Sequence, residues 1–90
     1  MSEQEKKWSA AQIERTRDTL ERIDVVAFSF QLGRPNKGCG MDHLDGRYGY
    51  ITLKDAMNET WKVFDYDTDE LYGDYGSIQA VIDAGWKVST

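Results

Sequence analysis

Residues 61–88, WKVFDYDTDELYGDYGSIQAVIDAGWKV, decide the fold of this chain of 90 residues. Two runs within them, 61–66 and 71–75, are rich in aromatic and β-branched residues, and the cluster Asp67-Thr68-Asp69 between the runs is typical of a turn. This pattern predicts a β-hairpin with a three-residue loop. The strand partners, each pair sharing one face of the hairpin, would be Trp61–Tyr75, Lys62–Asp74, Val63–Gly73, Phe64–Tyr72 and Asp65–Leu71.

A short helix and a closing strand follow the hairpin. Ser77 is a typical N-cap residue, and the apolar residues after it recur at helical spacing, which predicts a helix over 78–84. Gly85 would end this helix in the left-handed conformation that glycine adopts most easily. Residues 86–88 indicate a final strand. Because a helix this short is unstable alone, we expect it to pack on the hairpin.

The N-terminal half begins with a second predicted helix. Ser9 and Gln12 form a capping box, and Trp8 and Ile13 are placed to form the hydrophobic staple that accompanies it. Apolar or small residues then recur at spacings of three and four, as on one face of a helix. These residues are Ile13, Thr16, Leu20, Ile23 and Ala27. Residues 1–7 are polar, and we expect them to be frayed.

Residues 25–32 could extend this helix, because Gly33 and Pro35 are helix-stop signals. However, large apolar residues alternate along the segment with other side chains, and its Val, Phe and Ser residues are poor helix formers. We therefore predict a strand over 25–32. Residues 33–47, GRPNKGCGMDHLDGR, are punctuated by glycine and proline and predict a long loop.

Residues 48–53 predict a strand, and residues 55–59 a turn that leads into the hairpin. The competing interpretation is a helix over 53–64, which Thr52 and Asp55 would cap. We prefer the interpretation with a strand, a turn and a second strand, because the predicted hairpin needs the run 61–66 as its first strand. The whole chain is thus expected to be a single α+β domain. Its parts would be an N-terminal helix, an antiparallel sheet with a three-stranded meander over about 48–75 and further strands at 25–32 and 86–88, and a short C-terminal helix.

The distribution of charge and the cysteine content limit the classes of protein to which the chain could belong. Residues 1–54 hold nine Lys or Arg against eight Asp or Glu, whereas residues 55–90 hold two against eight. Such an acidic half argues against direct binding to nucleic acid, which needs clustered Lys and Arg, and fits a basic protein partner or simply solubility. A single cysteine excludes an internal disulfide. The polar N-terminus is not a signal peptide and no apolar run could span a bilayer, so we expect a cytoplasmic protein.

Two clusters contain residue types that can bind metals or catalyse reactions. Asp65-x-Asp67-x-Asp69 resembles the opening of a calcium-binding EF-hand loop, but Glu70 and Gly76 stand where that loop requires glycine and glutamate. Cys39 and His43 lie four residues apart, but a closed zinc site needs four ligands, and no further cysteine or histidine is present. We therefore expect no metal, no cofactor and no catalytic residue.

The aromatic residues point instead to binding. If Ile51, Leu53, Trp61 and Val63 face the core, the opposite face holds Tyr48, Tyr50, Phe64 and Tyr72. Aromatic residues rimmed by carboxylates are typical of protein-binding surfaces, although the N-terminal helix could instead cover this face. In size, charge and aromatic content the chain resembles small phage- or mobile-element-encoded inhibitors, such as the anti-CRISPR proteins.

The expected function is therefore that of a non-enzymatic inhibitor. Its acidic, aromatic face would occupy a basic, nucleic-acid-binding surface of a partner protein. The residues expected to make this contact are Asp65, Tyr66, Asp67, Asp69, Glu70, Tyr72 and Asp74. The alternatives are a small-molecule-binding or enzymatic domain that uses loop 33–47 with Cys39 and His43, and a homodimeric accessory domain.

Overall fold

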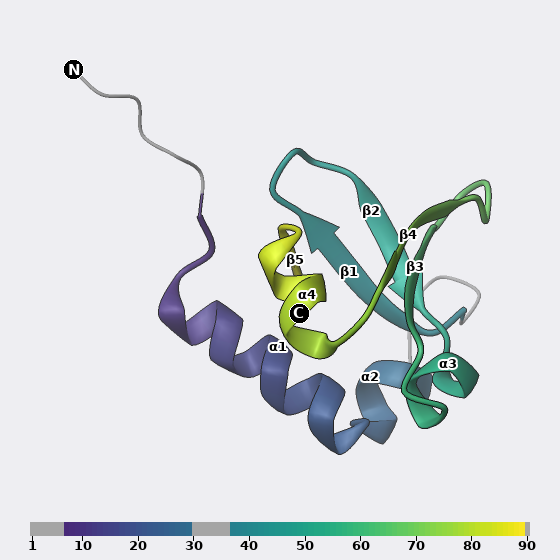
Figure 1. Cartoon of the computed structure of the whole chain (residues 1–90), viewed down its shortest axis with the longest axis horizontal. Coiled ribbons are helices and arrows are strands. Elements are labelled where there is room, and N and C mark those ends of the chain that lie inside the picture. The colour runs from purple at the N-terminus through teal and green to yellow at the C-terminus, as the bar shows by residue number, and fades with distance from the viewer. Residues whose placement is uncertain (1–6, 30–36, 90) are drawn as a thin grey trace.

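The computed structural model describes residues 7–29 and 37–89, and they form an α+β fold, as predicted (Figure 1). The helices are α1 (Ala10–Arg22), α2 (Val25–Ser29), α3 (Leu53–Met57) and α4 (Ile78–Asp83), and the strands are β1 (Cys39–His43), β2 (Tyr48–Ile51), β3 (Trp61–Asp65), β4 (Leu71–Tyr75) and β5 (Trp86–Val88). The strands build one antiparallel sheet in the order β4-β3-β2-β1-β5. Strands β1 to β4 follow one another as a meander, and β5 joins at the free side of β1.

The core lies between one face of the sheet and the helices packed on it. Its largest fully buried side chains include Leu20, Phe28, Met41, Ile51, Val63, Val81 and Trp86. Burying a side chain of this size stabilises the fold by about 1.5–3 kcal/mol. Among residues 7–29 and 37–89, no helix is both long and apolar enough to cross a membrane.

Helix α1 begins as predicted. The Gln12 amide donates to Ser9 Oγ over 3.1 Å, and the Ser9 amide donates to Gln12 Oε1 over 2.8 Å, which completes the capping box. The helix ends at Ile23, which adopts a left-handed conformation with φ of 49°. This turn separates α1 from the next segment.

The predicted strand over 25–32 is wrong where the structure describes it, because Val25–Ser29 is helix α2. The Asp24 carboxylate accepts hydrogen bonds from the amides of Val26 (2.9 Å) and Ala27 (3.4 Å) and so caps a new helix directly after the turn. Phe28 is buried in the core. Local capping and the burial of one aromatic ring therefore outweigh the strand preference of these residues. Residues 30–32 lie outside the described ranges.

The predicted loop over 33–47 is also wrong for residues 39–43, which form β1. Cys39 and Met41 are buried in the core, and they alternate with Gly40 and Asp42 on the other face. One of the glycines that suggested a loop, Gly38, serves close packing instead, since an added Cβ would lie 2.2 Å from the carbonyl oxygen of Ile51. The remaining turn is residues 44–47, and residues 33–36 lie outside the described ranges.

The predicted hairpin forms, with one shift of register. Trp61, Lys62 and Val63 pair with Tyr75, Asp74 and Gly73, as predicted. Phe64 then pairs with Leu71, so the predicted pairs Phe64–Tyr72 and Asp65–Leu71 are wrong. A β-bulge leaves Tyr72 without a partner on β3, and its ring packs on Trp86 with centroids 5.4 Å apart.

Both interpretations of residues 53–64 are partly right. Helix α3 begins at Leu53, and Thr52 Oγ1 accepts from the Asp55 amide over 3.0 Å, as the helical interpretation expected. The helix ends at Met57, and β3 begins at Trp61, as the hairpin required. Leu53 was expected to face the core, but it lies on α3 and is 40% exposed.

The C-terminal elements agree with the prediction. Ser77 Oγ accepts from the Ala80 amide over 3.1 Å and caps α4. Gly85 follows with φ of 103°, and β5 runs from Trp86 to Val88.

Candidate functional site

The turn between β3 and β4, residues 65–70, is the acidic turn of this protein, and it lies at the upper right of Figure 1. Asp65 organises it: one carboxylate oxygen accepts from the amides of Asp67 (2.7 Å) and Thr68 (3.0 Å), and the other accepts from the Tyr72 hydroxyl. The Tyr72 hydrogen bond and then the two amides lower the pKa of Asp65, and the same bond raises the pKa of Tyr72. The Asp65 charge therefore helps to fold the turn.

Lys37 holds the acidic turn against the sheet. Its ammonium group donates to Asp69 Oδ1 over 3.0 Å and to the carbonyl oxygen of Tyr66 over 2.7 Å. The Tyr50 hydroxyl also donates to Asp69 Oδ1, over 2.8 Å. These bonds lower the pKa of Asp69, with Tyr50 the larger cause. Burial, followed by the bond to Asp69, raises the pKa of Tyr50 to about 12.

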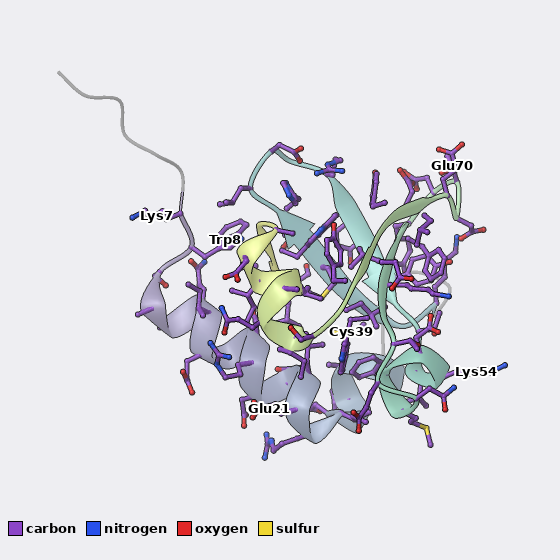
Figure 2. The ribbon with its side chains drawn as sticks, in the orientation of Figure 1. Lys7, Trp8, Glu21, Cys39, Lys54 and Glu70 are labelled. Atoms are coloured by element: carbon purple, nitrogen blue, oxygen red, sulfur yellow. The ribbon has the colours of Figure 1, made fainter. Side chains whose placement is uncertain are left out.

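The hairpin carries three further carboxylates, on Asp67, Glu70 and Asp74. All three residues are exposed, and no hydrogen bond or ion pair from the described residues reaches their carboxylates. Glu70 points away from the body of the molecule at the tip of the turn (Figure 2). Leu71 lies beside it and is 52% exposed. We call these four residues the acidic edge.

The aromatic residues divide between the two faces of the sheet. Three of the four residues predicted to share one face do so, and Tyr66 joins them, in a cluster of Tyr48, Tyr50, Phe64 and Tyr66. The prediction is wrong for Tyr72, because the bulge carries its ring to Trp86 on the opposite face. Tyr50 is 8% exposed and Tyr66 is 5% exposed. Tyr66 therefore offers a partner little contact area.

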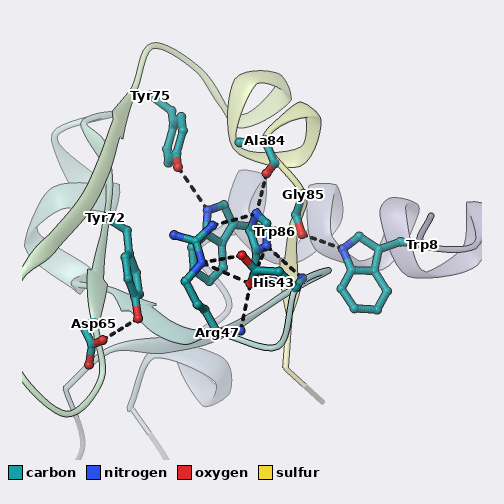
Figure 3. A network of polar contacts seen from close by, with 10 residues as sticks. Trp8, His43, Arg47, Asp65, Tyr72, Tyr75, Ala84, Gly85 and Trp86 are labelled. Carbon is teal, nitrogen blue, oxygen red and sulfur yellow. Dashed lines mark hydrogen bonds and ion pairs between the residues drawn. The ribbon is translucent and has the colours of Figure 1, made fainter. Parts of the chain in front are cut away.

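The turn between β1 and β2, residues 44–47, lies at the same end of the sheet (Figures 1 and 3). Arg47 Nε donates to both carboxylate oxygens of Asp45, over 2.8 and 3.1 Å, and the guanidinium group lies 4.7 Å from the centroid of the Tyr72 ring. Hydrogen bonds from the backbone and side chain of Arg47 lower the pKa of Asp45 to about 2. This turn thus neutralises its own carboxylate.

His43 joins the same turn to the end of α4. Its Nε2 lies 2.7 Å from the carbonyl oxygen of Ala84, and its Nδ1 lies 3.1 Å from the Asp45 amide (Figure 3). Arg47 Nη2 also lies 3.2 Å from Nε2, and Asp45 Oδ1 lies 2.9 Å from Nδ1. The ring also packs edge-on against Trp86, with centroids 4.7 Å apart. His43 is therefore occupied by contacts that hold the fold.

Cys39 and His43 are not brought together. They lie on the same extended strand, so their Cα atoms are roughly 13 Å apart. Cys39 is fully buried, and burial raises the pKa of its thiol to about 12, which keeps the thiol protonated and unreactive. In the part of the chain that the structure describes, no group of three or more His, Cys, Asp or Glu residues could hold a metal ion. The arrangement gives no support to the alternative of a Cys39–His43 site.

A groove of about 500 Å³ lies at the other end of the sheet, between α1, α3 and the segment before α4. The residues that line it are Arg17, Leu20, Glu21, Ile23, Ala56, Met57, Glu59, Trp61, Gly76, Ser77, Ile78 and Gln79. The sequence carried no signal for this groove, because its walls come from three separate segments. Lys37 was missed for a related reason, since nothing near it in the sequence links it to the acidic turn.

Comparisons with known proteins do not indicate a function, so a proposed function has to be argued from the arrangement of these residues. No protein-family model, curated protein or solved structure matches the chain.

Proposed function

We propose that this protein is a non-enzymatic inhibitor whose acidic edge occupies a basic, nucleic-acid-binding surface of another protein. The observation that carries the proposal is that the carboxylates of Asp67, Glu70 and Asp74, on one projecting hairpin, have no partner among the described residues. Exposed like charges repel one another, and Lys62, opposite Asp74, is the one cation on the facing strand β3, so the fold gains little from this arrangement. A basic partner would turn the repulsion into attraction.

The rest of the hairpin supports such a contact by holding the charges in place. Asp65 and Asp69 fix the backbone of the acidic turn through the bonds with Tyr72 and Lys37, so little conformational freedom would be lost on binding. Surfaces that bind nucleic acid present clustered Lys and Arg to the phosphates. Carboxylates spaced along a rigid hairpin offer the same cations an alternative partner.

Charged groups and apolar groups would contribute to binding in different ways. Carboxylates at the rim mainly speed the encounter with a basic surface, whereas buried apolar groups slow dissociation. Leu71 supplies apolar area beside the carboxylates, and the half-buried ring of Tyr72 supplies more on the opposite face of the hairpin. The small phage- or mobile-element-encoded inhibitors that the sequence resembles are one class that would act in this way, in the cytoplasm of a host cell.

The test compares two variants of equal net charge. The edge variant, Asp67→Asn with Glu70→Gln and Asp74→Asn, removes the unpaired charges and leaves Asp65 and Asp69 in place. The control variant removes three exposed carboxylates from helices α1 and α4, by Glu14→Gln, Glu21→Gln and Asp83→Asn. The amide oxygen that Asp83→Asn introduces could still accept the hydrogen bond that Gln79 donates to the carboxylate.

Proteins captured from host-cell lysate by the wild type would be purified and measured by surface-plasmon kinetics at low and physiological salt. We expect the edge variant to associate about tenfold more slowly at low salt and with a flatter salt dependence, and the control variant to match the wild type. The wild type should also displace labelled nucleic acid from the captured protein. Equal association rates for wild type and edge variant at both salts, or nucleic acid that stays bound at saturation, would contradict the proposal.

A further inference from the structure

The two edge strands of the sheet, β4 and β5, differ in their contacts. Other parts of the chain form hydrogen bonds to β5. At β5, the Val88 amide donates to Thr16 Oγ1 of α1 over 3.0 Å. Just before β5, the Trp8 indole donates to the carbonyl oxygen of Gly85 over 2.8 Å (Figure 3). Helix α1 therefore uses the Val88 amide, an outward-facing donor of this edge that another strand would need, and Trp8 ties the segment before α1 to the start of β5.

The opposite edge, β4, has no such cover among residues 7–29 and 37–89. Strand β4 pairs with β3 on one side, and no side chain of the described residues donates to or accepts from its backbone. Backbone amides and carbonyls at an unpaired edge are a template for a further strand. Leu71 and Asp74, towards either end of β4, are exposed.

Charge decides which strand fits this edge. A second copy of β4 would bring two residues Asp74 and two residues Glu70 to one seam, and like charges across strands are destabilising. A segment that carries Lys or Arg would instead be attracted, because its cations would face carboxylates that have no partner among residues 7–29 and 37–89.

We propose that β4 accepts an extended, basic segment of the partner protein as a sixth strand of the sheet. This inference rests on the proposed function and states the form of the contact. Asp74 pairs with Lys62 and Leu71 pairs with Phe64, so both lie on the face away from the core. The added strand would therefore place a cation beside Asp74 and an apolar residue beside Leu71, two positions apart on one face.

The test uses wild-type protein and two peptides of the same charge. The probe is acetyl-Lys-Thr-Val-Thr-Lys-Thr-Val-Thr-Lys-amide, which alternates Lys and Val on one face. The control peptide has the same side chains but carries N-methyl groups on the central Thr-Lys-Thr, which removes amide donors from both edges of the strand. Amide hydrogen exchange of Leu71–Tyr75 and of Trp86–Val88 is followed with and without each peptide.

We expect the probe to slow exchange in β4 and not in β5, and the control peptide to bind about tenfold more weakly. Equal binding of both peptides without protection of β4 would overturn the added strand. Protection of β4 that rises with protein concentration, in the absence of peptide, would show that a second copy takes the edge and would also overturn it. In either case the proposed function stands as long as the edge variant associates slowly with its partner, so the two failures are distinguishable.

Discussion

The turn of residues 44–47 and the acidic turn of residues 65–70 lie at the same end of the sheet, and each contains carboxylates that shape its backbone. In the first turn, Asp45 is held by Arg47, and His43 and Arg47 contact Trp86 in the core. In the second, Asp65 and Asp69 are held in a similar way, but Asp67 and Glu70 have no partner among the described residues.

This difference shows how charge that serves the fold can be told apart from charge that serves another molecule. Where each carboxylate has a donor, its removal should weaken the protein. Where a carboxylate has none, its removal should leave the protein intact and change only what it binds. The predictions that follow test this division, beginning with the largest effect on stability.

Gly85→Ala should be the most damaging change, because it breaks the contact between the first turn and the end of α4. The residue has φ of 103°, and an added Cβ would lie 2.8 Å from His43 Nε2. We expect a loss of about 2–4 kcal/mol in the free energy of unfolding, from backbone strain and from the clash together. Urea denaturation would measure it.

Gly46→Ala is the matched control for this change. Gly46 also has a positive φ, of 100°, but an added Cβ would have no neighbour within 4 Å. It should cost about 1 kcal/mol, for backbone strain alone. Equal losses for the two variants would mean that the contact between Gly85 and His43 contributes nothing.

Lys37→Met should have the next largest effect, because it removes the cation that folds the acidic turn. Loss of the hydrogen bond to the Tyr66 carbonyl should lower the free energy of unfolding by about 1 kcal/mol. Repulsion among the carboxylates adds a part that shrinks as salt is added. Lys54→Met, at an exposed lysine of α3, is the control and should change neither quantity. Identical denaturation curves for the two variants would show that Lys37 does not hold the turn.

Tyr72→Phe should change how stability depends on pH. The pKa of Asp65 is lowered in the folded state, chiefly by Tyr72, so this carboxylate stabilises the fold above its unfolded pKa of about 4 and ceases to do so as pH falls through its folded pKa. Without the hydroxyl, the Asp65 pKa returns towards its ordinary value. The variant should therefore be less stable than the wild type at neutral pH and approach it in acid. Urea denaturation at a series of pH values would detect this, and parallel curves would contradict it.

The edge variant should have the smallest effect on stability. Because Asp67, Glu70 and Asp74 have no hydrogen-bond or ion-pair partner in the described part of the chain, the free energy of unfolding should change by less than about 0.5 kcal/mol, and any change should be an increase. A clear loss of stability would mean that these charges serve the fold after all. The comparison between the two turns would then fail.

Much of this fold followed from local signals in the sequence. The capping box at Ser9, the N-cap at Ser77 and the glycine at Gly85 each depend on a few neighbouring residues, and each was predicted. The signals that failed depend on distant residues. The strand at 39–43 is buried between β2 and β5, and Gly38, directly before it, fits against Ile51, a neighbour that local spacing does not reveal.

The candidate site shows the same limit. The carboxylates of the hairpin could be found by their spacing, but the sequence does not say which of them are neutralised. Lys37, which is far from Asp69 in the chain, makes that difference. One bulge likewise separates Tyr72 from Tyr66, although the two residues are close in the sequence.

The pairing of β1 with β5 constrains the order in which the strands of the sheet can pair during synthesis of the protein. On the ribosome, β1 to β4 can pair as they emerge, because each neighbour in the meander is made directly after the last. The other side of β1 must wait for Trp86–Val88, and until then α1 also lacks Val88 as the donor to Thr16. A nascent chain thus carries an open edge at β1, where another unfinished copy could pair. Slow passage through the codons for α4 and β5 would lengthen that exposure and favour aggregation.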